Sequence, residues 1–237
     1  MASVELDVND TLGVTPATNA AAHVPSQSRP ADPAGELSAA ALFYAEEWHW
    51  QVSLGTWLET AEDGARRCSC ATDDCPTPGA HPARRNWKSA PTPRPDKMRE
   101  WWREHPLASV ILPTGKSFDV VDVPETAGCL ALARLERSDV PLGPVAATPQ
   151  RRMLFFVLPG AAGKMVDLVR KQGYAPSALD LAVHGEGSYI PAPPTRLGGL
   201  GSVQWARRPT VANSWLPDLE AVISPLAYAC GRERRMR

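Results

Sequence analysis

The sequence predicts a mixed fold of the α/β or α+β class, and three observations lead to this expectation. Short runs rich in β-branched residues alternate along the chain with stretches of helical periodicity. Apolar residues make up 43% and charged residues 22% of the 237 positions, as in ordinary globular proteins. The 24 prolines interrupt the chain often, so short elements joined by extended connections are expected.

The first expected helix covers 36–50, where apolar residues recur at i, i+4, i+7, i+8 and i+11. Residues 1–34 are rich in Ala, Pro, Ser and Thr and predict a disordered tail. Residues 63–95 contain three cysteines and several prolines and predict an irregular insertion. A short helix over 96–105 follows, and Pro106 stops it.

A strand-rich core is expected after this helix. Two β-branched runs, 108–112 and 118–123, flank a tight turn at 113–116. Because strands and helices interleave from there on, we place one domain over 35–210 and a helix with a basic tail over 211–237. The remaining predicted elements are strands at 153–158 and 188–192 and helices at 126–137, 163–172 and from 216 onward.

Charge and hydropathy exclude several classes of protein. The formal net charge is −1, so the chain has no global basic field, and any contact with DNA or RNA requires a local patch. The longest apolar runs fall far short of the roughly 20 residues that a membrane span needs. No basic region followed by an apolar stretch marks a secretory signal, so we expect a cytoplasmic protein.

Three of the five cysteines lie within eight residues, which predicts a metal site rather than disulfides. Three thiolates and one imidazole suit tetrahedral Zn²⁺, and four protein ligands make the site structural. Free thiols in a loop, or Asp73 or Asp74 as the fourth ligand, are the alternatives. Cys129 and Cys230 are expected to be small buried residues. The predicted ligands of this knuckle, residues 66–84, are Cys68, Cys70, Cys75 and His81.

Several local motifs occur in a distinctive order along the chain. They are Tyr44-Ala45, 68–82, Trp87, Trp101-Trp102, Pro106, Thr114-Gly115, 118–123, Thr148-Pro149 and 185–194. This order resembles the bifunctional DNA primase/polymerase (prim-pol) domain of the archaeo-eukaryotic primase superfamily, common in actinobacterial and mobile-element proteins. The resemblance implies a prim-pol-like core with a zinc-knuckle insertion, and nucleotide polymerisation with two Mg²⁺ or Mn²⁺ ions held by clustered carboxylates.

The residues that this resemblance would make catalytic depart from the family pattern. The pattern implies an acidic pair at the end of a strand, a histidine on a later strand, and a third acid before a glycine-rich turn. Asp122 matches the first acid, but the other three positions fall on Pro124, Leu154 and Ala182. Three losses predict a degenerate catalytic site.

An active site would have to use shifted carboxylates, namely Asp122, Glu125 and Asp180. Glu125 is a poor substitute for an acid at position 124, because adjacent residues of a strand point to opposite faces. Two metal ions about 3.5–4 Å apart require at least two carboxylates within about 5–6 Å of each other.

Three functions follow from these observations. The first is a stand-alone prim-pol-like protein with a degenerate site that binds nucleic acid or a protein partner, in replication or its regulation. The second is an active primase/polymerase, and the third is a protein-interaction scaffold whose groove is filled by Leu154 and Pro124. Local basic patches are predicted to contact nucleic acid. The alternative is that the same arginines lie in solvent-exposed turns and bind nothing. The patches comprise Arg66, Arg67, Arg84, Arg85, Arg151 and Arg152.

Overall fold

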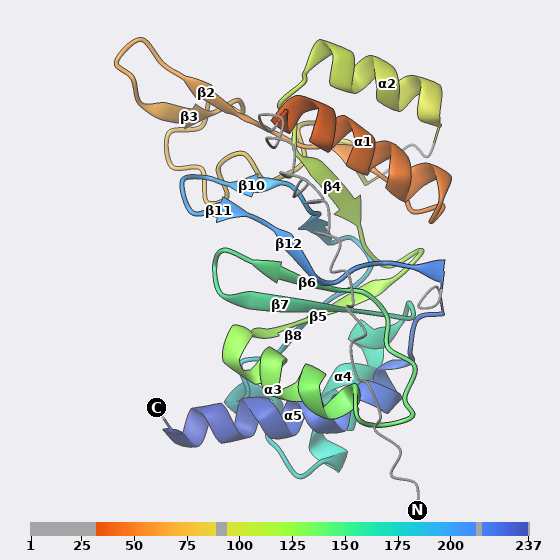
Figure 1. Cartoon of the computed structure of the whole chain (residues 1–237). Helices are drawn as coiled ribbons and strands as arrows, with labels where there is room; N and C mark the ends of the chain where they lie inside the picture. Colours follow the sequence, from red (N-terminus) through yellow and green to blue (C-terminus); the bar gives the residue numbers. More distant parts are fainter. Residues whose placement is uncertain (1–31, 89–93, 212–214, 237) are drawn as a thin grey trace, which may run out of the picture. The chain divides into compact units, whose positions relative to one another are not determined.

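An antiparallel five-stranded sheet forms the centre of the computed structural model, which describes residues 32–88, 94–211 and 215–236 (Figure 1). All of these residues belong to one unit that begins at Asp32. The sheet order is β12-β6-β7-β5-β8. These strands are β12 (Gln204–Arg207), β6 (Val145–Thr148), β7 (Arg152–Val157), β5 (Asp119–Pro124) and β8 (Ala182–His184).

Three helices cover one face of this sheet (Figure 1). They are α3 (Glu125–Leu135), α4 (Ala161–Lys171) and α5 (Leu219–Met236), and a short 3-10 turn, Pro176–Ala178, follows α4. Val121 and Val123 of β5 point into this layer and are fully buried. Asp119 lies on the same face, where its carboxylate accepts a hydrogen bond of 3.2 Å from the backbone N–H of Ala162, in the first turn of α4.

The other face packs against a second apolar core. This layer contains a three-stranded sheet and two helices: β1 (Ser53–Leu54), β4 (Val110–Pro113), β9 (Tyr189–Pro191), α1 (Pro33–Glu46) and α2 (Pro95–Glu104). Val120, Leu154 and Phe156 of the five-stranded sheet point into it. Because side chains alternate along a strand, Asp122 shares this face with Val120. Two small hairpins complete the unit: β2 (Leu58–Thr60) with β3 (Arg66–Cys68), and β10 (Arg196–Leu197) with β11 (Gly201–Ser202).

The mixed fold class is confirmed, and several details of the prediction are wrong. The first helix begins at Pro33, with Asp32 as its N-cap, and ends at Glu46 because the chain turns to bring Trp50 against Tyr44. The basic C-terminal residues continue α5 to Met236 instead of forming a tail. The predicted insertion includes β3, which forms a hairpin with β2 just before the insertion. Strands that were not predicted are β1, β2, β3, β6, β8, β10, β11 and β12.

One prediction about a single side chain is also corrected. Trp101 and Trp102 are both buried, because α2 packs against α1 and Trp102 donates to the carbonyl of Ala108. Cys230 is buried as expected, but Cys129 is exposed on α3. The predicted disordered tail covers 1–34. Residues 1–31 lie outside the described residues, and residues 33–34 belong to the start of α1. Within the described ranges, no helix is both long and apolar enough to span a bilayer.

Candidate functional site

The β2–β3 hairpin and the turns after it bring the four predicted metal ligands together. Cys68 ends β3, and the left-handed backbone of Ala71 (φ +57°) and Gly79 (φ +71°) folds the following loop back over the hairpin. As a result, the ligand atoms all lie within 4.8 Å of one another. The converging ligands are Cys68, Cys70, Cys75 and His81.

The geometry of this cluster fits Zn²⁺. The Sγ atom of Cys68 lies 3.4 Å from Nε2 of His81. Tetrahedral zinc, with bonds of about 2.3 Å to sulfur and 2.0 Å to nitrogen, would hold the two atoms roughly 3.5 Å apart. The other ring nitrogen of His81, Nδ1, lies 3.1 Å from the carbonyl oxygen of Pro82, which can accept its proton and leave Nε2 for a metal. Zinc bound here would close the knuckle with four protein ligands.

Hydrogen bonds attach the knuckle to the three-stranded sheet. The hydroxyl of Ser109 donates to the carbonyl of Gly79, and the hydroxyl of Thr56 donates to the carbonyl of His81 at 3.2 Å. The backbone N–H of Gly79 in turn donates to Cys68 Sγ at 3.3 Å. Thr56 follows β1 and Ser109 precedes β4, so the ligand loop is held at one end of the three-stranded sheet.

A second polar cluster lies where β5, β7 and β8 meet. The Arg152 guanidinium donates from Nε to Asp122 at 2.7 Å and from Nη1 to Asp180 at 2.8 Å. His184 places Nε2 3.0 Å from the other carboxylate oxygen of Asp122 and Nδ1 3.4 Å from the Ser188 hydroxyl. A neutral ring can donate to Asp122 and accept from Ser188 at the same time. We call Asp122, Arg152, Asp180 and His184 the ion cluster.

The strand register explains why these side chains meet. Asp122 pairs with Leu154 on β7 and with Ala182 on β8, so all three share one face of the sheet. Leu154 is only 3% exposed and belongs to the apolar core. Arg152 and His184 each lie two residues from one of these neighbours, on the same face. Leu154 therefore lies beside Asp122 at the position where the family pattern implies a histidine. Ala182 lies beside Asp122 at the position where the pattern implies an acid.

The electrostatics of the ion cluster are set by the Arg152 guanidinium. Burial works to lower the pKa of the Arg152 guanidinium, but the hydrogen bonds and charges of Asp122 and Asp180 outweigh it and raise the pKa. A permanent cation therefore occupies the space between the two carboxylates. Glu125 does not join them, because it begins α3 and its carboxylate pairs with Arg151 at 3.3 Å. Among the described residues, the Cys₃His cluster is the only group of three or more His, Cys, Asp or Glu side chains placed closely enough to hold one metal ion.

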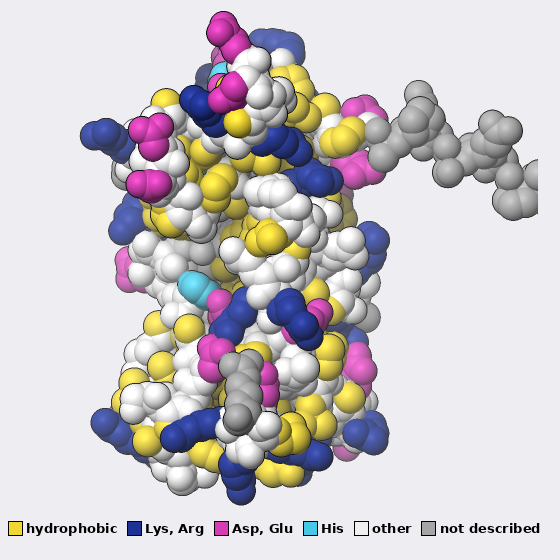
Figure 2. Space-filling view, turned by 90° about the vertical axis from the view of Figure 1, so that its left-hand side faces the viewer, with side chains coloured by type: hydrophobic (Ala, Val, Ile, Leu, Met, Phe, Trp, Pro, Cys, Tyr) yellow, Lys and Arg dark blue, Asp and Glu magenta, His cyan; other side chains and the backbone are white. Residues whose placement is uncertain are grey.

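The predicted nucleic-acid contacts are dispersed over several elements. Arg67 pairs with Asp63 at 2.8 Å, and the Arg84 guanidinium lies 4.9 Å above the ring of Trp101. Arg66 and Arg85 are exposed and have no partner within the described ranges. Figure 2 shows that Lys and Arg side chains on one face alternate with Asp and Glu and form no continuous basic area among the residues in colour.

Sequence reasoning missed His184 and the role of Arg152. His184 belongs to a three-residue strand that was not predicted, and its alternation with Ala182 is the signal that would have placed it beside Asp122. Arg151 and Arg152 were both placed among the predicted nucleic-acid contacts. The two side chains diverge because Arg151 is in the left-handed region (φ +61°) at the turn before β7.

Comparison with known proteins adds one finding to this geometry. The family model described as "Bifunctional DNA primase/polymerase, N-terminal" matches residues 41–219. The matched range includes the Cys₃His knuckle and the ion cluster. No curated protein matches the chain.

Proposed function

The chain belongs to the family of bifunctional DNA primase/polymerase N-terminal domains, and from this membership we propose a prim-pol-like protein that binds nucleic acid without polymerising nucleotides. The observation that carries the proposal is the guanidinium of Arg152 between Asp122 and Asp180. Two-metal catalysis needs that space for divalent cations, because the ions must contact the carboxylates directly.

Binding in this proposal uses the exposed basic side chains around the knuckle. Arg66 lies on β3 and Arg85 follows the ligand loop, so a bound zinc ion would fix the positions of both. Their charge attracts phosphates without selecting a sequence. The zinc itself would be structural, because all four tetrahedral positions are taken by protein ligands.

Primer extension on the purified, zinc-loaded protein tests the absence of polymerisation. Extension and de novo priming are measured with Mg²⁺ and with Mn²⁺, alongside Asp122→Ala. We expect no product from either protein. Product that appears with the wild type and vanishes with Asp122→Ala would contradict the proposal.

Fluorescence anisotropy with a labelled single-stranded 20-nucleotide DNA tests the binding. The Arg66→Ala/Arg85→Ala protein should bind several-fold more weakly and show a smaller salt dependence, because each lost phosphate contact removes about one released counterion. Arg137→Ala serves as the control, because Arg137 is exposed just after α3 and belongs to none of the predicted basic patches. Equal affinity of all three proteins would reject the assigned patch.

An active polymerase is the second candidate, and one observation favours it. Asp122 and Asp180 both reach the same guanidinium, so a rotation of the Arg152 side chain would expose two carboxylates to one centre. Product that depends on Asp122 in the assay above would support this function in place of the first.

A further inference from the structure

A groove runs along α1, separate from the knuckle and the ion cluster. It consists of two hollows of about 610 and 680 Å³ that share Phe43 and Pro209. Residues of α1 line one wall, and residues 202–205, 208–211 and 215–216 line the other. Each hollow has the size of an ordinary ligand site.

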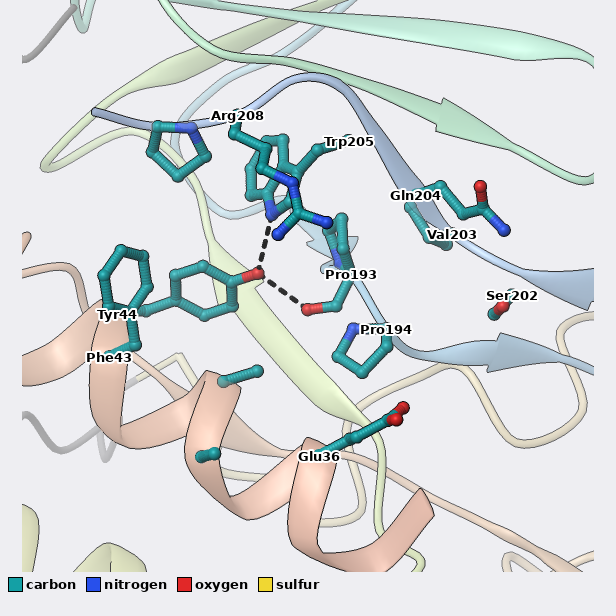
Figure 3. A pocket seen from close by; sticks show the side chains of 13 residues that line it. Glu36, Phe43, Tyr44, Pro193, Pro194, Ser202, Val203, Gln204, Trp205 and Arg208 are labelled. Atoms are coloured by element: carbon teal, nitrogen blue, oxygen red, sulfur yellow. Dashed lines mark hydrogen bonds between the residues drawn. The ribbon is translucent and has the colours of Figure 1, made fainter. Parts of the chain in front are cut away.

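The floor of the first hollow is fixed by buried hydrogen bonds (Figure 3). The hydroxyl of Tyr44 donates to the carbonyl of Pro193 at 2.7 Å and accepts from Trp205 Nε1 at 3.2 Å. Burial raises the pKa of Tyr44, so the hydroxyl keeps its proton. These bonds join α1 to the strand opposite, so the groove exists before any ligand arrives.

Large apolar side chains are exposed along the groove. Phe43 is 41%, Leu158 44% and Trp215 84% exposed, and all three line the second hollow. Converging aromatic and aliphatic side chains of this kind mark interaction sites, and aromatic residues are the usual anchors of protein–protein interfaces. Isolated exposed apolar residues, such as Leu200, need no such explanation.

The charges of the groove distinguish between possible ligands. Glu36 lines the first hollow and Glu47 the second, and neither has an ion-pair partner among the described residues. Glu46, by contrast, pairs with Arg99 of α2 at 2.8 Å. Arg208 contributes the one guanidinium of the lining, so two carboxylates face one positive charge. This balance repels the phosphates of nucleic acid and attracts a basic ligand.

We propose that this groove binds a peptide segment of another protein, in which a large apolar side chain is flanked by Lys or Arg. The apolar side chain packs against Phe43 and Trp215, and the basic residues pair with Glu36 and Glu47. The proposal is independent of nucleic-acid binding, because it uses no residue of the knuckle or the ion cluster.

Selection from a phage-displayed library of random 12-residue peptides on the full-length protein tests this site. The selection uses the wild-type protein without prior depletion, and the enriched peptides are synthesised for anisotropy measurements on the wild type and each variant. We expect sequences with an aromatic or aliphatic residue next to Lys or Arg, and at least a tenfold loss of affinity with Phe43→Ala. Leu200→Ala is the matched control, because it removes an exposed apolar side chain outside the groove and should leave affinity unchanged.

Charge reversal separates the proposed ligand from its rivals. Glu36→Lys/Glu47→Lys should weaken the basic peptides and bind versions in which Glu replaces the Lys and Arg. Circular dichroism and thermal melting confirm that each variant is folded. The proposal is overturned by the absence of enriched peptides, by peptides that bind Phe43→Ala or the charge-reversed protein equally well, or by Phe43-dependent binding of a single-stranded oligonucleotide.

Discussion

Position 152 places a guanidinium between two carboxylates on the face of the sheet where the family pattern implies metal ions. The pairs with Asp122 and Asp180 have short distances, and the side chains of Arg152 and Asp122 are only 24% and 18% exposed. Interactions in such a half-buried setting are screened less than surface ion pairs. We therefore expect that breaking the cluster destabilises the protein, because it leaves a half-buried charge without its partner.

Arg152→Met should destabilise the protein by about 1–2 kcal/mol, because it leaves a half-buried carboxylate without its cation. Arg151→Met, at the adjacent position, should change stability by no more than about 0.5 kcal/mol, since its pair with Glu125 is 76% and 40% exposed. Urea denaturation of both variants measures the difference. Equal effects would show that the ion cluster is energetically no different from a surface pair.

Contacts between residues close in the sequence could be predicted from their spacing, whereas contacts set by the pairing of two strands could not. The knuckle ligands fall within fourteen positions of one another, so their spacing alone indicated a shared ion. The contact between Arg152 and Asp122 spans 30 positions and depends on how β5 pairs with β7. Nothing in a single sequence fixes that register, and the pairing of Arg152 was missed for this reason.

The turn between β4 and β5 packs against the loop before β9. The hydroxyl of Thr114 donates to the carbonyl of Gly185 at 2.6 Å, and a Cβ atom added to Gly115 would lie 2.3 Å from Cα of Glu186. Gly115 also has a φ of +99°. This contact joins the two sheets next to His184 and Ser188.

Gly115→Ala should therefore cost at least about 2 kcal/mol, from backbone overlap and left-handed strain together. Gly163→Ala is the matched substitution, because Gly163 lies inside α4 and an added Cβ meets nothing within 4 Å. It should stabilise the protein by about 0.5–1 kcal/mol. Thermal melting of the two variants should shift in opposite directions, and a shift of the same sign would contradict this account.

The knuckle gives a metal-dependent prediction at the scale of one element. Cys75→Ser should lose bound zinc and lower Tm by at least about 5 °C, since 1 kcal/mol corresponds to about 2–4 °C in a domain of this size. Cys129→Ser removes an exposed cysteine outside the cluster and should keep both zinc and Tm. Atomic absorption and calorimetry measure the two quantities. Unchanged zinc content in Cys75→Ser would refute the ligand assignment.

The helices with strong periodicity were predicted, and most of the strands of two to four residues were not. The helix α2 was placed within one residue of its bounds, because proline marks both its ends. The strands β10, β11 and β12 lie in a glycine- and proline-rich stretch and have two to four residues each. Such strands are stabilised by their partners in the sheet, which sequence patterns do not reveal.

On the scale of the whole unit, Tyr44 links the first helix to the last strand. Its two hydrogen bonds span 149 and 161 positions of the chain. Tyr44→Phe should cost about 1–3 kcal/mol, because the carbonyl of Pro193 and the N–H of Trp205 lose their partner. Tyr228→Phe is the control, since Tyr228 is 40% exposed and its ring stays available to Arg134. Equal stability of both variants in urea would show that the link is energetically neutral.

The guanidinium of Arg152 is covalently part of the chain, so a chelator cannot remove this cation and another ion cannot exchange with it. On our proposal, the charge balance of the ion cluster does not depend on the cellular magnesium supply, whereas the knuckle depends on zinc. Zinc starvation would then loosen the knuckle while the ion cluster keeps its structure. Two parts of one chain would respond differently to the same shortage of metals.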